Sequence, residues 1–235
     1  GGIGTAICQR LHKEGFKVIA GCGPTRDHAK WLAEQKALGY TFHASVGNVS
    51  DWNSTTEAFA QTKAEHGPID VLVNNAGIIV REGYGSPGAA TAFARVMDVN
   101  VMGTFLPTQA WLPALRATRG CIINLASIAA GAGLAGTAGY SPSKGAVKML
   151  TQALASELAR DGVRVNAIAP GVIETPMTES TRAAPDKLDK FMARTPMARV
   201  GQPEELVGPV VFLASPMASY ITGAMLPVDG GFLAA

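Results

Sequence analysis

Apolar and polar positions follow two alternating patterns along the chain. Short apolar runs predict strands at 17–22, 41–46, 69–74, 121–126, 163–168 and 224–228. Longer stretches with helical spacing of apolar residues predict helices at 4–14, 27–38, 51–66, 91–118, 141–160 and 203–214. Strands that alternate with helices in this way predict an α/β fold, a doubly wound parallel sheet (Rossmann-like) with helices on both faces.

The first predicted helix directly follows the glycine turn formed by residues 1–4. A dinucleotide fold has a strand that leads into such a turn, and we expect this first strand to be missing from the sequence. A protein that truly began at Gly1 would lose a central strand, so we expect it to fold poorly and bind its cofactor weakly. The intact mass of the purified protein distinguishes this case from a longer natural chain.

Composition restricts the class of protein. The chain has 235 residues, of which 47% are hydrophobic and 16% charged, which is enough for one sizeable core and predicts a single domain over 1–235. The net charge of +2 comes from scattered lysines and arginines and predicts no nucleic-acid partner. Apolar runs stay shorter than the roughly 18 residues that span a bilayer, so we expect a cytoplasmic protein without membrane contact.

Cysteine and histidine give no indication of a metal or a disulfide framework. The three cysteines lie at unrelated positions, and the four histidines lack the spacing of ligands. We predict no metal site.

Tyr140 and Lys144 are four residues apart at the head of a predicted helix and therefore lie on one helix face. A nearby ammonium lowers the pKa of a phenol. A change from about 10 to near 7 takes roughly 4 kcal/mol, and two charges about 4 Å apart at an effective dielectric near 20 supply about that much. We therefore expect Lys144 to make Tyr140 a usable acid, the alternative being an ordinary surface pair.

Other polar residues follow the predicted strands. Ser127 closes the apolar run 121–126, and Asn75 follows the run 69–73. Open α/β sheets bind ligands at the carboxyl ends of their strands, so these side chains are candidates for the same site as Tyr140 and Lys144.

Eight features resemble the short-chain dehydrogenase/reductase family in their order and spacing. They are Gly-Gly-Ile-Gly at 1–4, Asn-Asn-Ala-Gly at 74–77, Asn100, Ser127, Tyr140, Lys144, Pro170-Gly171 with Thr175, and Val-Asp-Gly-Gly at 228–231. The resemblance covers essentially the whole chain. The first third, through about Asn75, resembles acetoacetyl-CoA reductases, and the remainder resembles 3-oxoacyl-carrier-protein reductases and sugar or alcohol dehydrogenases.

The resemblance implies hydride transfer between a nicotinamide and a carbonyl carbon. It implies that Tyr140 gives a proton to the forming alkoxide and that Ser127 hydrogen-bonds the same oxygen. It implies that Lys144 also holds the nicotinamide ribose and that Asn100 anchors a water linking Lys144 to solvent.

The resemblance also implies a set of cofactor contacts. Its members besides Tyr140 and Lys144 are Gly2, Ile3, Gly4, Cys22, Arg26, Asn48, Val49, Asn75, Ala76, Gly77, Pro170, Gly171, Ile173 and Thr175. Cys22 stands where NAD-preferring folds place an acidic residue, and Arg26 follows, so we predict NADP(H) with NAD(H) as the alternative. Asn48 occupies the place of an aspartate in most relatives. Arg26 as a solvated residue at a helix start is the other interpretation.

Three functions remain open. Reduction of a β-ketoacyl thioester (acetoacetyl-CoA or 3-oxoacyl type) by NADPH leads, and an NAD(P)-dependent sugar or secondary-alcohol dehydrogenase is second. A non-catalytic, cofactor-sensing protein is third, although the four family tetrad residues are present. In the loop 129–139, Leu134, Ala135 and Thr137 replace the glutamines and aromatic residue of acetoacetyl-CoA reductases, which puts that substrate in doubt.

Two further expectations concern larger parts of the chain. Residues 176–202 mix apolar and charged side chains and resemble the family's substrate lid. The predicted helices 91–118 and 141–160 have apolar residues on more than one face, as in helices that form a subunit interface, and predict a homotetramer.

Overall fold

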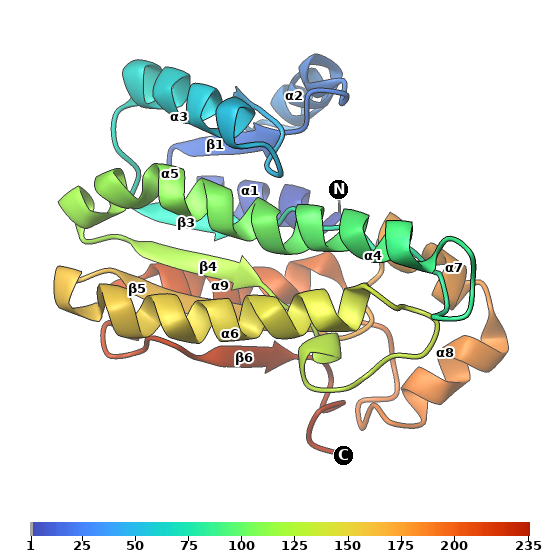
Figure 1. Ribbon diagram of the computed structural model, residues 1–235. Coiled ribbons are helices and arrows are strands. Elements are labelled where there is room, and N and C mark those ends of the chain that lie inside the picture. Colours follow the sequence, from blue (N-terminus) through green and yellow to red (C-terminus); the bar gives the residue numbers. More distant parts are fainter. Residues whose placement is uncertain (1) are drawn as a thin grey trace.

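The computed structural model describes residues 2–235 and confirms the Rossmann-like α/β fold (Figure 1). The strands are β1 (Val18–Cys22), β2 (Phe42–Val46), β3 (Val71–Asn74), β4 (Cys121–Leu125), β5 (Arg164–Pro170) and β6 (Met225–Val228). The α-helices are α1 (Gly2–Lys13), α2 (His28–Ala37), α3 (Trp52–His66), α4 (Ala89–Met97), α5 (Gly103–Thr118), α6 (Tyr140–Leu158), α7 (Glu179–Arg182), α8 (Pro185–Met192) and α9 (Val207–Ala214).

The strands form two parallel sheets. One has the order β1-β2, and the other has the order β3-β4-β5-β6. Residues 2–235 contain no strand that pairs β1 with β3, and the two sheets are joined through a shared apolar core that includes Val18 and Phe42 of one sheet and Ile123 of the other.

Helices cover both faces of the larger sheet, as the sequence predicts (Figure 1). α1 and α9 pack together behind it, and their residues Ile7, Leu11 and Val210 enter the core shared by the two sheets. α5 and α6 lie in front, where Leu115 and Leu158 enter a second core. Because both faces are covered, every side chain of β4 is buried, as is usual for a central parallel strand.

The predicted helix 91–118 is interrupted, which corrects the sequence prediction. Residues Asp98–Met102 form a π-helical turn between α4 and α5. The side chain of Asn100, in this turn, is fully buried and hydrogen-bonded. A single wide turn leaves the apolar spacing on either side almost unchanged, so the sequence pattern does not indicate it. The predicted helix 203–214 likewise begins with a 3₁₀ segment, Pro203–Leu206, before α9.

Because all strands are parallel, their carboxyl ends lie at one edge of the molecule, on the right in Figure 1. Several predicted site residues, among them Asn75, Ser127 and Gly171, follow these ends, and α1 begins at the same edge. Within residues 2–235 no helix is both long and apolar enough to cross a membrane.

Candidate active site

Ser127 and Tyr140 bring two hydroxyl groups together at the carboxyl edge of β4. Ser127 directly follows the strand region in extended conformation, and its Oγ accepts a hydrogen bond from Ala129 N (3.1 Å). This bond caps the 3₁₀ turn Ile128–Ala130 and fixes the hydroxyl. Tyr140 begins α6, and its hydroxyl lies near enough to Ser127 for the serine side chain to lower the pKa of the phenol.

Lys144 lies one turn further along α6, on the face that Tyr140 occupies. Its Nζ lies 5.8 Å from the centroid of the Tyr140 ring and donates a hydrogen bond of 2.6 Å to Leu125 O. The side chain is buried, and burial lowers its pKa from 10.5 to about 8. The expected pairing on one helix face is confirmed.

The predicted net lowering of the Tyr140 pKa is wrong for this structure. Burial raises the pKa of Tyr140 above its ordinary value and outweighs the effects of the Ser127 side chain and the positive charge of Arg81, which both lower it. The ammonium lies over the ring face and donates to a backbone carbonyl. The sequence spacing predicts proximity, but it does not predict how much solvent the fold removes.

Asn100 connects the segment after β3 to α6. Its Nδ2 donates to Ile78 O (3.0 Å) and to Ser143 Oγ (2.9 Å), and Ile78 N donates to its Oδ1 (2.8 Å). Ser143 Oγ in turn donates to Tyr140 O (2.7 Å). The amide therefore braces the first turn of α6, and the water-anchoring role implied by the family stays a prediction.

Glycines allow the predicted cofactor residues to approach one another closely. A Cβ on Gly4 would lie 2.8 Å from Asn75 Nδ2, and one on Gly2 would lie 3.0 Å from the Thr175 side chain. The start of α1, with Ile3 between these glycines, thus meets the segments after β3 and β5. Backbone N–H groups at a helix start, free of Cβ atoms, fit the pyrophosphate of a dinucleotide.

The residues predicted to contact the nicotinamide end of the cofactor also lie close to one another or to the tetrad. A Cβ on Gly77 would lie 3.4 Å from Asn100 Oδ1 and 3.6 Å from Lys144 Nζ, so Gly77 and its neighbour Ala76 border the tetrad. Pro170 ends β5, and a Cβ on Gly171 would lie 2.9 Å from Asp229 Cα in the turn after β6.

The adenosine end follows β1 and β2. Cys22 ends β1, Arg26 is exposed four residues later, and the neighbouring Asp27 caps α2 by accepting a hydrogen bond from Lys30 N (2.9 Å). The carboxylate of Asp27 is therefore occupied by this hydrogen bond at the start of α2.

Asn48 and Val49 follow β2. The Asn48 Oδ1 accepts hydrogen bonds from Ser50 N (3.2 Å) and Ser50 Oγ (2.9 Å), which shape the turn before α3. Val49 packs against the start of α5, where a Cβ on Gly103 would lie 2.8 Å from Val49 Cγ2.

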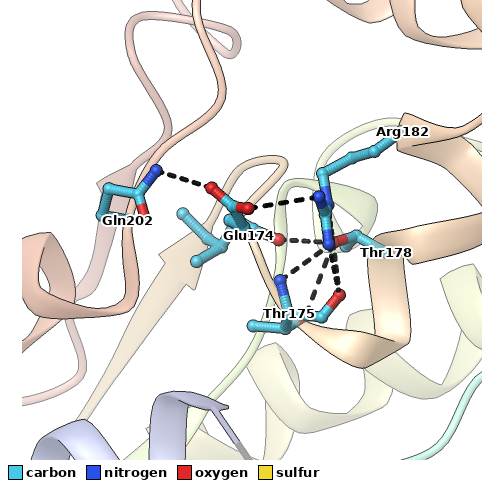
Figure 2. A network of polar contacts seen from close by, with 6 residues as sticks. Glu174, Thr175, Thr178, Arg182 and Gln202 are labelled. Atoms are coloured by element: carbon cyan, nitrogen blue, oxygen red, sulfur yellow. Dashed lines mark hydrogen bonds and ion pairs between the residues drawn. The ribbon is translucent and has the colours of Figure 1, made fainter.

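Thr175 belongs to a polar network at the base of the segment 176–202 (Figure 2). Arg182 of α7 donates to Thr175 O (3.3 Å) and pairs with Glu174 (3.4 Å), while Gln202 donates to Glu174 Oε2 (2.9 Å). Ile173 and Gly201 form a parallel β-bridge. The two ends of the segment, which carries α7 and α8, are therefore joined beside Thr175.

The loop between Ser127 and Tyr140 lines a shallow hollow of about 580 Å³. Small residues of 129–135 form one wall, and Tyr84 and Thr137 contribute polar groups. Neither Ser127 nor Tyr140 lines this hollow, so the prediction that the loop walls the substrate pocket stays a prediction. In the described part of the chain, no group of three or more His, Cys, Asp or Glu side chains is placed to hold a metal ion.

Arg81 is a charged residue of this site that the sequence analysis did not single out. It follows the Asn-Asn-Ala-Gly segment, and its charge acts on the Tyr140 hydroxyl. Its Nη2 donates to Thr181 Oγ1 of α7 (2.9 Å). A lone arginine shortly after a strand's carboxyl end was the available indication in the sequence.

The fold and these side chains define a class of protein. A Rossmann-like α/β fold that places a hydroxyl, a phenol and a buried ammonium beside a glycine-lined helix start is that of a nicotinamide-dependent oxidoreductase.

The chain belongs to the short-chain dehydrogenase/reductase family. The profile of the family described as "Enoyl-(Acyl carrier protein) reductase" matches residues 1–233. The protein is thus an oxidoreductase that acts on alcohol or ketone groups with NAD(P).

Three similar proteins span nearly the whole chain. An acetoacetyl-CoA reductase of Cupriavidus necator is 44% identical over 98% of this chain and 94% of its own length. A galactitol 2-dehydrogenase (L-tagatose-forming) of Cereibacter sphaeroides is 39% identical over 98% of this chain and 91% of its own length. The structure of a gluconate 5-dehydrogenase from Burkholderia cenocepacia, in complex with NADP and tartrate, has a TM-score of 0.92 and 31% identity and covers 100% of this chain and 92% of its own.

Proposed function

We propose that the protein reduces a ketone with NADPH, with Tyr140 as the proton donor. The observation that carries this proposal is the position of the buried Lys144 over the Tyr140 ring, with Ser127 near the phenol, at the sheet edge where the glycines at the start of α1 pack closely against Asn75 and Thr175.

Each residue has a defined role in this reaction. The bound cofactor supplies a hydride to the carbonyl carbon. Tyr140 gives its proton to the carbonyl oxygen, and the resulting hydroxyl leaves with the product. Ser127, whose Oγ is fixed by Ala129 N, donates a hydrogen bond to the same oxygen as its negative charge grows.

Lys144 acts mainly when Tyr140 has lost its proton. The raised pKa keeps the phenol protonated before the reaction, as a donor requires. With a pKa of about 8, Lys144 is largely charged at neutral pH, and its charge in a buried site stabilises the phenolate that proton transfer leaves behind. Lys144 would also hold the nicotinamide ribose, and Asn100 would hold a water beside it.

NADP(H) is the proposed cofactor. The exposed Arg26 is available for a 2′-phosphate, while the Asp27 carboxylate caps α2. The NADP complex of the similar gluconate 5-dehydrogenase supports the same choice. A lower Michaelis constant for NADPH than for NADH is expected, and a clear preference for NADH would overturn this assignment.

The leading substrate is a β-ketoacyl thioester, as acted on by the acetoacetyl-CoA reductase to which the chain is 44% identical. A second candidate is the oxidation of a sugar or secondary alcohol, which the galactitol 2-dehydrogenase and the gluconate 5-dehydrogenase favour.

A substrate panel followed by NADPH absorbance distinguishes the two candidates. Faster reduction of acetoacetyl-CoA than of simple β-ketoesters supports the thioester. Oxidation of polyols with NADP⁺ or NAD⁺, without thioester reduction, supports the second candidate. If the protein binds NADPH but turns over none of the ketones and alcohols, the result would instead support a non-catalytic, cofactor-sensing protein.

A further inference from the structure

Arg81 has a free charge beside the reacting groups. Among residues 2–235, its side chain makes one hydrogen bond, to Thr181 Oγ1, which leaves most of its N–H donors unused, and it forms no ion pair there. Arg81 is exposed, whereas Thr181 is buried, so the guanidinium is anchored on one side and open to solvent on the other.

Hydrogen bonds hold the chain next to Arg81 against the segment that leads into Tyr140. Ala138 N donates to Glu82 O (3.1 Å), and the Tyr84 hydroxyl donates to Ala138 O (3.1 Å). The residue after Arg81 is thus bonded to the chain only two residues before Tyr140. The effect of the Arg81 charge on the phenol, whose pKa it lowers, agrees with this proximity.

An arginine held this way recognises a particular chemistry. The guanidinium is planar, stays charged, and offers paired N–H groups that match the two oxygens of a carboxylate. A neutral ketone or alcohol gains little from it. The phosphates of a CoA thioester lie at the far end of a long pantetheine arm, away from the carbonyl that reacts beside Tyr140.

We propose that Arg81 is a specificity-determining residue that binds a carboxylate of the substrate, so that the enzyme acts on oxo acids and hydroxy acids, in which case the second candidate substrate class displaces the thioester. This inference rests on the proposed role of the Tyr140 site in carbonyl reduction and names the substrate class for it. Thr181 is a positioning residue, because it holds the guanidinium from α7.

The test compares an acid with its neutral counterpart in wild-type, Arg81→Ala and Arg160→Ala proteins. Acetoacetate is paired with methyl acetoacetate for reduction by NADPH, with acetoacetyl-CoA measured alongside, and gluconate is paired with sorbitol for oxidation by NADP⁺. Arg160 is an exposed arginine near the opposite end of α6 and serves as the matched control.

We expect wild type to favour the acid in at least one pair. Arg81→Ala should lower kcat/KM for that acid by about 10- to 100-fold, the range for a lost hydrogen bond to a charged group. The neutral partner should change less than about threefold, and Arg160→Ala should change neither. Thr181→Val should give a smaller loss in the same direction.

Three results would overturn the inference. They are equal losses for acid and neutral partner in Arg81→Ala, unchanged acid kinetics, or a loss confined to acetoacetyl-CoA, which would assign the arginine to the CoA phosphates. Calorimetric titration of the two acids and their two neutral partners into the enzyme–NADP⁺ complex measures binding without turnover. It therefore tests the role of Arg81 even if the proposed reaction is wrong. Without turnover, tighter acid binding that Arg81→Ala removes still supports the inference, and its absence overturns it.

Discussion

At the scale of single residues, the buried Lys144 lowers the stability of the folded protein. Its pKa is about 8 in the fold and 10.5 as an ordinary lysine, so burying the charged form costs about 3 kcal/mol of unfolding free energy at neutral pH. Between pH 8 and 10.5 the unfolded chain binds more protons than the folded one, so this cost is relieved as the pH rises.

Replacing Lys144 by Met should therefore remove the pH dependence that Lys144 gives to the free energy of unfolding. Wild type should gain stability relative to Lys144→Met between pH 7.5 and pH 10, by up to about 2–3 kcal/mol, as measured by urea unfolding. Lys148→Met, one turn further along α6, is the control and should follow wild type. Parallel pH profiles of wild type and Lys144→Met would refute the assigned burial of the charge.

The residues of the site were predictable to different degrees. The Tyr140–Lys144 pairing follows from the helical spacing, and Ser127 follows from its place after a buried strand. The direction of the Tyr140 pKa shift did not follow, because it depends on how much solvent other elements exclude. Arg81 could not be predicted from the sequence, because the contact that positions its side chain is with Thr181, a hundred residues away.

At the scale of elements, a strand or helix could be predicted where its own sequence pattern is sufficient to determine it. The strand β4 is a continuous apolar run and was predicted to within one residue of its end. The π-helical turn Asp98–Met102 was not, since it arises from the buried hydrogen bonds of Asn100 to Ile78 and Ser143. Those partners lie in other elements, and local periodicity carries no information about them.

The segment 176–202 is proposed to act as a lid, with Arg182 joining its first helix to Thr175. Arg182→Ala should weaken NADPH binding several-fold, because Thr175 loses a support beside the proposed cofactor site. Stability should change by less than about 1 kcal/mol, as is usual for an exposed ion pair. Fluorescence titration with NADPH and thermal unfolding measure the two effects.

The control for this prediction is Arg10→Ala, which breaks an exposed ion pair between Arg10 of α1 and Glu14, just after that helix. It should leave NADPH affinity unchanged. If Arg182→Ala binds NADPH as wild type does, the network in Figure 2 only holds the segment together and does not support the cofactor.

At the scale of the whole molecule, α5 and α6 leave apolar side chains uncovered on their outer face. Phe105 of α5 and Met149 of α6 are 38% and 60% exposed, and Met102, in the π-helical turn just before α5, is 40% exposed, which is more than a helix that only covers a sheet requires. We propose that these helices pack against a second copy of the chain, within a homotetramer with two-fold axes.

Light scattering at micromolar concentration should accordingly give the mass of a tetramer. Phe105→Glu and Met149→Glu should reduce it, because each places a charge in the proposed interface. Met217→Glu, at an exposed methionine on another part of the surface, should not. A monomeric mass for wild type would contradict the proposal.

The central claim, that Tyr140 donates the proton, is tested most directly by Tyr140→Phe. This change removes the hydroxyl and keeps the ring over which Lys144 lies. With a ketone that wild type reduces, we expect the dissociation constant for NADPH to stay within about twofold and kcat to fall by about 10²- to 10⁴-fold. A variant that binds NADPH and turns over at the wild-type rate would show that the proton comes from another group.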